Sequence, residues 1–469
     1  MVGVLEALTS PSPPEPALGI GRRIGNSLHH LLVGCSSLPP GCPPERATCT
    51  GTFLPSLQPP APSSIIDKMR RGPLLLLAAL LSAFSLAALL LNLAAPRLAC
   101  RLRLCPETVA LAEARRLLLA GTPQSAAESV RLYRRLVSRN PASPYRWCDL
   151  GDAQLAAGDL AQARDSFHQA QRLGPNIPQT LLRVAGFHFR LQEYDSALPL
   201  MARILSLTPN YDRLLFSYYD RMDTALASIL ERGIPPQPRA AQSYFLHVLK
   251  TAPPERAAYV WRWLLAGRFA GDAHAAAYTD FLVRNRRYSE AASAWASYLG
   301  PRSGDYPSPN LLFNGGFESP FLPCPFDWRL SPLPGAEASR DSSAPRSGSW
   351  SLRLRFLGSA NPQYRHLTQL AAVKPGPVLF RAFLKSDSLT TDQGLGFRIF
   401  DYESPSRLDI HTPRLTGSAG WTELRARFVI PSATSILAVQ LVRDRSIKFD
   451  NLIAGTAWID DVVLQPLTP

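Results

Sequence analysis

One long apolar run constrains this chain more than any other feature. From Pro73 to Ala95 there are 23 residues without a charge, and the polar side chains among them are Ser82, Ser85 and Asn92. At about 1.5 Å rise per residue, a helix of this length covers the roughly 30 Å core of a bilayer. The run is longer than the apolar region of a signal peptide, which has about 7 to 15 residues. The sequence therefore predicts a transmembrane signal anchor over residues 69–97.

The charges that flank this run do not fix its orientation. Three basic residues stand on either side, so the positive-inside count is a tie. These residues are Lys68, Arg70, Arg71, Arg97, Arg101 and Arg103. A chain that starts at Met69 would leave a short tail inside and carry everything after residue 96 across. We therefore expect a single-pass inner-membrane protein whose bulk is periplasmic or extracytoplasmic.

Residues 1–68 form a segment of different character. They are rich in Pro, Ser and Gly, balanced at four basic and four acidic residues, and lack periodic apolar positions. Such a composition does not build a packed core. We expect either an upstream extension of the reading frame before a start at Met69, or a disordered cytoplasmic tail.

The composition of the whole chain narrows the class of protein. The net charge is +14, but no stretch combines dense basic residues with interleaved aromatics, so we expect no nucleic-acid partner. Arginine outnumbers lysine 45 to 5, which indicates a GC-rich, bacterial genome. The seven cysteines contain no CxxC pair and do not describe a disulfide scaffold. Cys100 and Cys105 either bridge or remain two free thiols.

Residues 106–300 carry apolar side chains at intervals of three and four, which is typical of stacked helices. In the best piece, Trp147, Leu150 and Gly151 open one helix, and Gly158 turns the chain. The next helix then carries Ala163, Phe167 and Ala170. Shifting by 34 residues maps Pro175 onto Pro209 and Ala163 onto Ala197.

These residues at this spacing resemble the tetratricopeptide repeat, whose unit is a helix, a turn and a helix. The resemblance is clearest over residues 108–211. It implies a curved solenoid whose concave groove binds an unidentified protein partner. Nearly every residue that carries the resemblance, including Trp147, Gly151, Ala163 and Phe167, is itself a packing residue.

A composition change near residue 305 marks a domain boundary, with a linker over residues 301–308. Short alternating runs follow until residue 469 and predict an antiparallel sandwich of the jelly-roll kind. The runs are WSLRLRF, PVLFRAFL, LGFRIFDY, WTELRARFVI, ILAVQLV and AWIDDVVLQP. The fold class is thus multidomain: one transmembrane helix, an all-α solenoid, and an all-β sandwich over residues 309–469.

The pieces NLLFNGGFES, SGSWSLRL, GWTELRARFVIP and AWIDDVVL, in this order, resemble carbohydrate-binding modules of the galactose-binding-like class. The resemblance implies a structural Ca²⁺ with Glu318 and Asp460 as ligands, since carboxylates suit a hard cation. Asp461 is the weaker candidate because in a regular strand it points away from Asp460. The alternative is that these carboxylates cap loops or meet arginines.

The same resemblance implies contacts to a saccharide through aromatic and planar polar side chains. The candidates are Tyr364, His366, Arg398 and Tyr402. The aromatic Trp328, Trp350, Trp421 and Trp458 are expected to be packing residues.

No chemistry-bearing motif occurs in the sequence, neither a GxSxG elbow nor a P-loop nor HExxH, so we expect a non-enzyme that requires no cofactor. We expect a membrane-anchored scaffold of the bacterial cell envelope whose sandwich binds polysaccharide, as in exopolysaccharide assembly or export. The alternatives are a pure protein scaffold with a structural sandwich, and an accessory subunit of a glycan-active enzyme.

Overall fold

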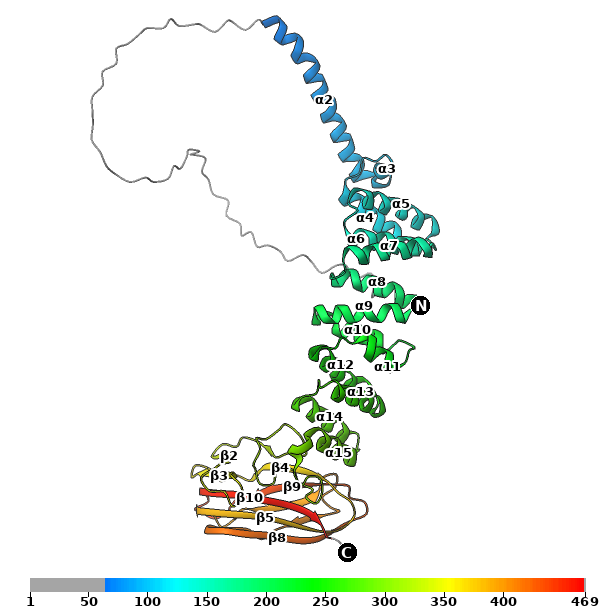
Figure 1. Cartoon of the computed structure of the whole chain (residues 1–469). Coiled ribbons are helices and arrows are strands. Elements are labelled where there is room, and N and C mark those ends of the chain that lie inside the picture. Colours follow the sequence, from blue (N-terminus) through cyan, green and yellow to red (C-terminus); the bar gives the residue numbers. More distant parts are fainter. Residues whose placement is uncertain (1–63, 468–469) are drawn as a thin grey trace, which may run out of the picture. The chain divides into compact units, whose positions relative to one another are not determined.

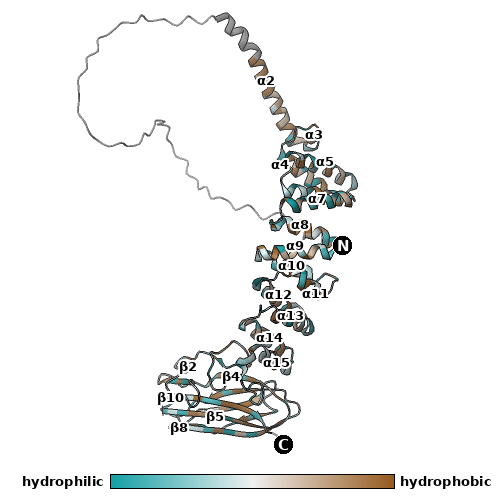
Figure 2. Cartoon of the chain, viewed as in Figure 1, coloured by the Kyte–Doolittle hydropathy of each residue, from teal (hydrophilic) through white to brown (hydrophobic). Residues whose placement is uncertain are grey.

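The apolar run folds as one long helix. The computed structural model describes residues 64–467, with side chains from residue 74 onward, and the expectations for residues 1–63 lie outside that range. Helix α2 (Ser64–Ala94) begins ahead of Met69. Its stretch Leu74–Ala94 has a mean hydropathy of 2.7, and its apolar residues are brown in Figure 2. None of this stretch is buried. This helix is long and apolar enough to cross a membrane, a property that a signal sequence would share.

Helices then follow one another as far as residue 299, as the sequence predicts (Figure 1). They are α3 (Pro96–Arg101), α4 (Glu107–Leu119), α5 (Pro123–Arg139), α6 (Pro144–Ala156), α7 (Leu160–Leu173), α8 (Pro178–Arg190), α9 (Tyr194–Leu207), α10 (Asp212–Tyr219), α11 (Leu226–Ser228), α12 (Pro238–Thr251), α13 (Pro254–Ala266), α14 (Asp272–Arg284) and α15 (Tyr288–Leu299). Several of them begin with proline, whose fixed φ suits the first helical position and whose missing N–H costs no bond there.

The predicted packing residues lie between neighbouring helices. Ala163 and Ala170 are fully buried and Phe167 is 1% exposed. A Cβ added to Gly151 on α6 would lie 2.9 Å from the Phe167 ring, so the two helices approach as closely as glycine allows. Gly158, at φ +82°, makes the turn between α6 and α7 that a larger residue would strain. Phe167 also stacks on Phe187 of the next hairpin, with ring centroids 4.6 Å apart.

Two five-stranded antiparallel sheets form the C-terminal domain, which confirms the predicted sandwich. Sheet A has the order β1-β4-β9-β6-β7 and sheet B the order β2-β3-β10-β5-β8. The strands are β1 (Arg329–Leu330), β2 (Ala336–Asp341), β3 (Ser351–Leu357), β4 (Tyr364–Ala372), β5 (Gly376–Leu389), β6 (Gly396–Asp401), β7 (Asp409–His411), β8 (Gly417–Ile430), β9 (Ile436–Arg443) and β10 (Ala454–Pro466). Each of the six runs forms a strand, whereas β1, β2, β4 and β7 were not predicted.

The helical domain and the sandwich share one hydrophobic core. Trp295 on α15 is fully buried and meets Phe313 edge to face, with ring centroids 6.1 Å apart. Leu370 on β4 and Ile436 on β9 belong to the same buried cluster. The segment predicted as a linker is packed as well, because its Tyr306 is only 4% exposed. The last hairpin therefore buries its apolar face on the outer side of sheet A.

The close contact at Gly151 gives a test of the repeat packing. We expect Gly151→Val to lower the free energy of unfolding by about 1–3 kcal/mol, because the added methyl groups collide with the Phe167 ring. Ala161→Val on the exposed side of α7 is the control, and its cost is expected to stay below about 0.7 kcal/mol. Urea unfolding of the full chain, followed by far-ultraviolet circular dichroism, measures both. Equal midpoints for the two variants would contradict the packing.

Candidate functional site

A row of polar side chains crosses the outer face of sheet A. The strand register places five residues directly opposite one another, one on each strand: Arg329, Thr368, Gln440, Arg398 and His411. Their sequence neighbours Leu367, Leu441 and Phe397 are fully buried between the two sheets. Because side chains alternate along a strand, the five polar groups share the outer face. We call this row the polar strip.

Hydrogen bonds hold the planar groups of the polar strip in place. Gln440 Nε2 donates to the Thr368 hydroxyl over 3.0 Å and also to the Arg365 carbonyl over 3.0 Å. Arg398 forms a bidentate pair with Asp409, with N–O distances of 2.8 and 2.7 Å. This ion pair holds the pKa of the Asp409 carboxyl below its usual range. A fixed amide, a guanidinium and a carboxylate side by side are suited to hydrogen-bonding the hydroxyl groups of a saccharide.

The helical domain limits how much of this face is open. The next row along the strands contains Leu370, Ala438 and Phe400, which pack into the core shared with α15. At the same edge, Tyr288 of α15 donates to Glu403 over 2.6 Å. The open part of the outer face is therefore the polar strip and the strand ends beyond it.

The four predicted glycan contacts do not form one site. Arg398 lies in the polar strip, and His366 lies on β4 two residues before Thr368. Tyr364 is 2% exposed, and burial raises the pKa of its phenol well above the usual value. Tyr402 is 50% exposed but lies after the end of β6, next to Glu403. Of the four candidates, Arg398 lies in the polar strip; Gln440 was not among them, although that glutamine interrupts the otherwise apolar run ILAVQLV.

The outer face of sheet B carries a second feature. Trp458 on β10 lies opposite Arg353 on one side and Lys385 on the other, and it is half-buried. The Lys385 ammonium stands 5.2 Å from the centroid of the indole ring. The indole Nε1 of Trp458 donates a hydrogen bond to the Asp341 carboxylate over 2.8 Å. Of the four tryptophans expected to be packing residues, Trp328 is in the core at 1% exposure, whereas Trp458 is half-buried on the outer face of sheet B.

The two predicted calcium ligands converge on one loop. Glu318 Oε1 accepts hydrogen bonds from the backbone N–H groups of Ser349 and Trp350, at 2.9 and 3.0 Å. Asp460 Oδ2 accepts from the N–H groups of Arg346 and Ser347, at 2.8 and 3.2 Å. The two carboxylates thus clasp residues 346–350, which is the loop-capping alternative that the sequence left open.

Asp461 differs from the prediction. The register of β10 against β5 shifts between Asp460 and Val463, and Asp461 has φ +49°. At this bulge the alternation of faces is broken. The Asp461 carboxylate accepts a hydrogen bond from the Ser347 hydroxyl over 2.6 Å, so it reaches the same loop as Asp460 instead of the opposite face.

The surroundings of the two carboxylates bear on whether a cation would fit. Among the residues that the structure describes, no group of three or more His, Cys, Asp or Glu side chains is placed to hold a metal. The groups directed at the pair are donors, and the Arg340 guanidinium already binds the carbonyl oxygens of Phe317 and Glu318. Burial raises the pKa of Asp460 to about 6. The hydrogen-bond donors around the two carboxylates therefore fit the capping of a loop better than the binding of a cation. A bound Ca²⁺ stays a prediction.

The substitution Glu318→Gln distinguishes a carboxylate that caps a loop from a carboxylate that binds Ca²⁺. Glu318 Oε1 receives both N–H groups, so Glu318→Gln keeps the clasp, whereas Glu318→Ala removes it at about 1–3 kcal/mol. We expect Glu318→Gln to melt like the wild type in EDTA, with Glu318→Ala melting lower. A rise in melting temperature on adding Ca²⁺ that is seen in the wild type but not in Glu318→Gln would identify a calcium ligand. Differential scanning fluorimetry of the full chain measures all three.

A further buried carboxyl lies near the junction with the helices. Asp327 is fully buried and accepts from the N–H groups of Leu322 and Trp328 at 2.8 and 2.7 Å. Burial raises its pKa to about 6, from a model-compound value of 3.8, although these hydrogen bonds oppose the shift. The folded state therefore holds this proton more tightly than the unfolded chain does.

This shift predicts a pH dependence with a defined sign. A carboxyl whose pKa is raised by folding stabilises the fold below about pH 4 and loses that contribution as the pH rises through about 6. Asp327→Asn does not titrate, so its stability relative to the wild type should improve by roughly 2 kcal/mol from pH 4 to pH 7. Urea unfolding at both pH values measures the difference. The exposed Asp165→Asn serves as control, and a similar improvement there would refute the assignment.

A wide cavity opens on the helices α5, α6 and α7. It has a volume of about 510 Å³ and lies between α5, α6 and α7. Apolar side chains of Val137, Trp147 and Leu150 line it together with Gln154 and Gln162. Trp147, predicted as a packing residue, is therefore half-buried at the edge of this cavity, and its Nε1 donates to the Pro141 carbonyl over 2.8 Å.

Comparison with known proteins yields structural likeness alone. No protein-family model and no curated protein sequence matches the chain. A family 16 carbohydrate-binding module aligns over 33% of this chain and 99% of its own, at 19% identity and a TM-score of 0.24. A xylan-binding domain of family 22 aligns over 34% and 97%, at 14% identity and a TM-score of 0.26. A xylan-binding domain from Paenibacillus barcinonensis aligns over 30% and 86%, at 11% identity and a TM-score of 0.22. The function is therefore argued from the geometry of the chain itself.

Proposed function

We propose that this chain is a membrane-anchored, non-catalytic scaffold of the bacterial cell envelope whose sandwich binds polysaccharide along the polar strip. Helix α2 supports the anchor, since Leu74–Ala94 carries no charge, has a mean hydropathy of 2.7 and is unburied. The bulk of the chain is then periplasmic, held by a single inner-membrane span. Exopolysaccharide assembly or export is a process in which such a scaffold would serve.

The observation that carries the polysaccharide proposal is the polar strip itself. Gln440 and Arg398 lie on adjacent strands in direct register, and both are already oriented by Thr368 and Asp409. Preorganised side chains lose little conformational entropy when a ligand binds. The strip also runs across all five strands of sheet A, so it offers an extended surface rather than a pocket for one sugar.

The core shared by α15 and sheet A supports the scaffold role. A sandwich on a flexible linker could search for its ligand independently, whereas this one is held against the helices by Trp295 and Phe313. The polar strip and the cavity beside Trp147 would therefore be two binding sites on one continuous unit, the first for polysaccharide and the second for a protein segment. The partner of the helical cavity is a protein in this proposal.

Two substitutions on opposite faces test the polysaccharide site. We expect Arg398→Ala to weaken binding at least tenfold, because one charged hydrogen-bond donor is worth about 1.5–3 kcal/mol. Trp458→Ala on sheet B should bind like the wild type. Affinity electrophoresis of the full chain against xylan, hydroxyethyl cellulose and alginate measures both. The detergent must be non-glycosidic, such as lauryldimethylamine oxide, because a maltoside would compete.

The outcomes separate the rival functions. If none of the polysaccharides retards the wild type, the strip is not a glycan site and the pure protein scaffold becomes the preferred function. If Trp458→Ala loses binding while Arg398→Ala keeps it, the glycan lies on sheet B. Co-purification with a hydrolase or glycosyltransferase would favour the third candidate, an accessory subunit of a glycan-active enzyme.

A further inference from the structure

The helices directly after the apolar helix are strongly basic. Between residues 97 and 139 there are nine arginines and three glutamates, with no lysine or aspartate, so the segment carries a net charge of +6 (9 − 3). The arginines are Arg97, Arg101, Arg103, Arg115, Arg116, Arg131, Arg134, Arg135 and Arg139. These residues belong to α3, α4, α5 and their connections, which are the first elements after α2. The largest local charge of the helical domain thus begins where the apolar helix ends.

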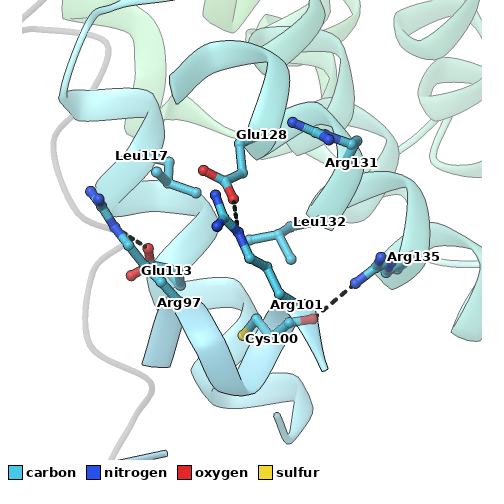
Figure 3. Close-up of a pocket in the computed structure, with 9 residues that line it drawn as sticks. All are labelled: Arg97, Cys100, Arg101, Glu113, Leu117, Glu128, Arg131, Leu132 and Arg135. Carbon is cyan, nitrogen blue, oxygen red and sulfur yellow. Dashed lines mark hydrogen bonds and ion pairs between the residues drawn. The ribbon is translucent and has the colours of Figure 1, made fainter. Parts of the chain in front are cut away.

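Several of these arginines surround a cavity of about 220 Å³ that α3, α4 and α5 form (Figure 3). Arg97 pairs with Glu113 at 3.2 Å, and Arg101 pairs with Glu128 at 3.1 Å. The two carboxylates in the cavity are thereby engaged, and Arg116 shares Glu113 at 2.6 Å.

Two other arginines of this cavity remain available. Arg131 and Arg135 are exposed, and among the side chains that the structure describes neither forms an ion pair with a carboxylate. Arg135 donates to the Cys100 carbonyl over 2.9 Å, which holds its guanidinium at the rim (Figure 3). A second cavity, of about 290 Å³, lies on the other side of Arg135 and is lined by Arg103 and Arg139.

Exposed leucines accompany the arginines. Leu98 on α3 is 48% exposed, and Leu102, directly after α3, is 55% exposed. Leu119 at the end of α4 is 74% exposed. A soluble surface seldom presents large apolar side chains beside a cluster of cations, whereas segments at a membrane interface combine the two. The leucines would contact acyl chains, while the arginines reach the phosphates above them.

The end of the apolar helix is fixed to this basic surface. Asn92 donates through Nδ2 to the Leu104 carbonyl over 3.2 Å, and Leu91 packs against the cluster that contains Ala99 and Cys100. Cys100 and Cys105 are bonded as a disulfide, which closes the turn between α3 and α4. The two cavities therefore lie close to the C-terminal end of α2.

We propose that α3, α4 and α5 bind the phosphate headgroup of an anionic phospholipid, in the leaflet that adjoins the C-terminal end of α2. The proposal rests on the membrane anchor of the proposed function. Guanidinium groups match the geometry of phosphate oxygens in bidentate pairs, and the paired glutamates keep Arg97 and Arg101 oriented towards the cavity. The lipid would fix the tilt and depth of the first helical hairpin at the membrane surface.

Lipid selectivity of the full chain tests this site. The chain is purified in lauryldimethylamine oxide, mixed with equal amounts of dioleoyl phosphatidylglycerol and dioleoyl phosphatidylcholine, and examined by native mass spectrometry. We expect preferential retention of phosphatidylglycerol, and the double variant Arg131→Gln/Arg135→Gln should reduce this preference by roughly fivefold for each arginine. Arg213→Gln, an exposed arginine on α10, is the matched control and should leave it unchanged.

Two further arms separate the alternatives. Free glycerol 1-phosphate at the same concentration should not displace the lipid, and equal competition would mean that the site takes a soluble phosphate instead. The double variant Arg131→Lys/Arg135→Lys keeps the charge and should recover most of the selectivity. Equal retention of both lipids by the wild type would overturn the proposal.

Failure of the lipid site can be told apart from failure of the anchor. Extraction of bacterial membranes with alkaline carbonate reports on the anchor alone. If the chain stays in the membrane fraction but shows no lipid preference, the anchor stands and the headgroup site is wrong. If the chain is released as a fragment that begins after α2, the apolar helix is a cleaved signal and both proposals fall.

Discussion

A helical hairpin cannot bury its apolar face alone, and the last hairpin of this chain buries its apolar face against a β-sheet. Trp295 of α15 and the side chains of Leu370 and Ile436 form one cluster with the buried core of the preceding helices. A solenoid normally needs a terminal repeat with a polar outer face. Here the sandwich takes that place, and the packing that caps the helices also decides which half of sheet A stays open.

The same packing shapes the candidate binding surface. Rows of side chains follow one another along the outer face of sheet A, and the row with Leu370 and Ala438 is covered while the row with Gln440 and Arg398 is not. A polar row beside a buried apolar row is what a sheet needs when only part of its face meets a partner. The polar strip is thus defined as much by the helices as by the strands that carry it.

Arginine serves different purposes in different parts of the chain. In the sandwich, Arg398 and Arg340 are committed to a carboxylate and to carbonyl groups, and they order the surface around them. In α5, Arg131 and Arg135 lack such carboxylate partners within the described side chains and face cavities beside exposed leucines. A net charge for the whole chain averages over these roles, and so it could not have located either surface.

The local patterns were sufficient to predict the helical region and six of the ten strands. Alternation predicted six runs as strands, and intervals of three and four predicted the helices, because both patterns depend on burial of one face of a single element. The strand β4 was missed because Gln369, Leu370 and Ala371 are buried in succession, where α15 covers the outer face, so this half of the strand shows no alternation. Packing residues such as Phe167 and Ala163 were also found, since small and aromatic positions at repeat spacing reflect contact between neighbouring helices.

The sites needed the tertiary structure. The sequence placed Glu318 and Asp460 as a pair, but which groups meet them depends on residues 346–350, more than a hundred positions from Asp460. A bulge then brought Asp461 to the same loop, against the alternation that a regular strand would impose. The polar strip joins side chains from five strands through register, and register is set by the pairing of distant segments. The sequence by itself determined the apolar helix, the helical character of the middle of the chain, and six of the ten strands that follow it. Only the tertiary structure decided which polar side chains lie side by side, because that depends on long-range pairing rather than on local periodicity.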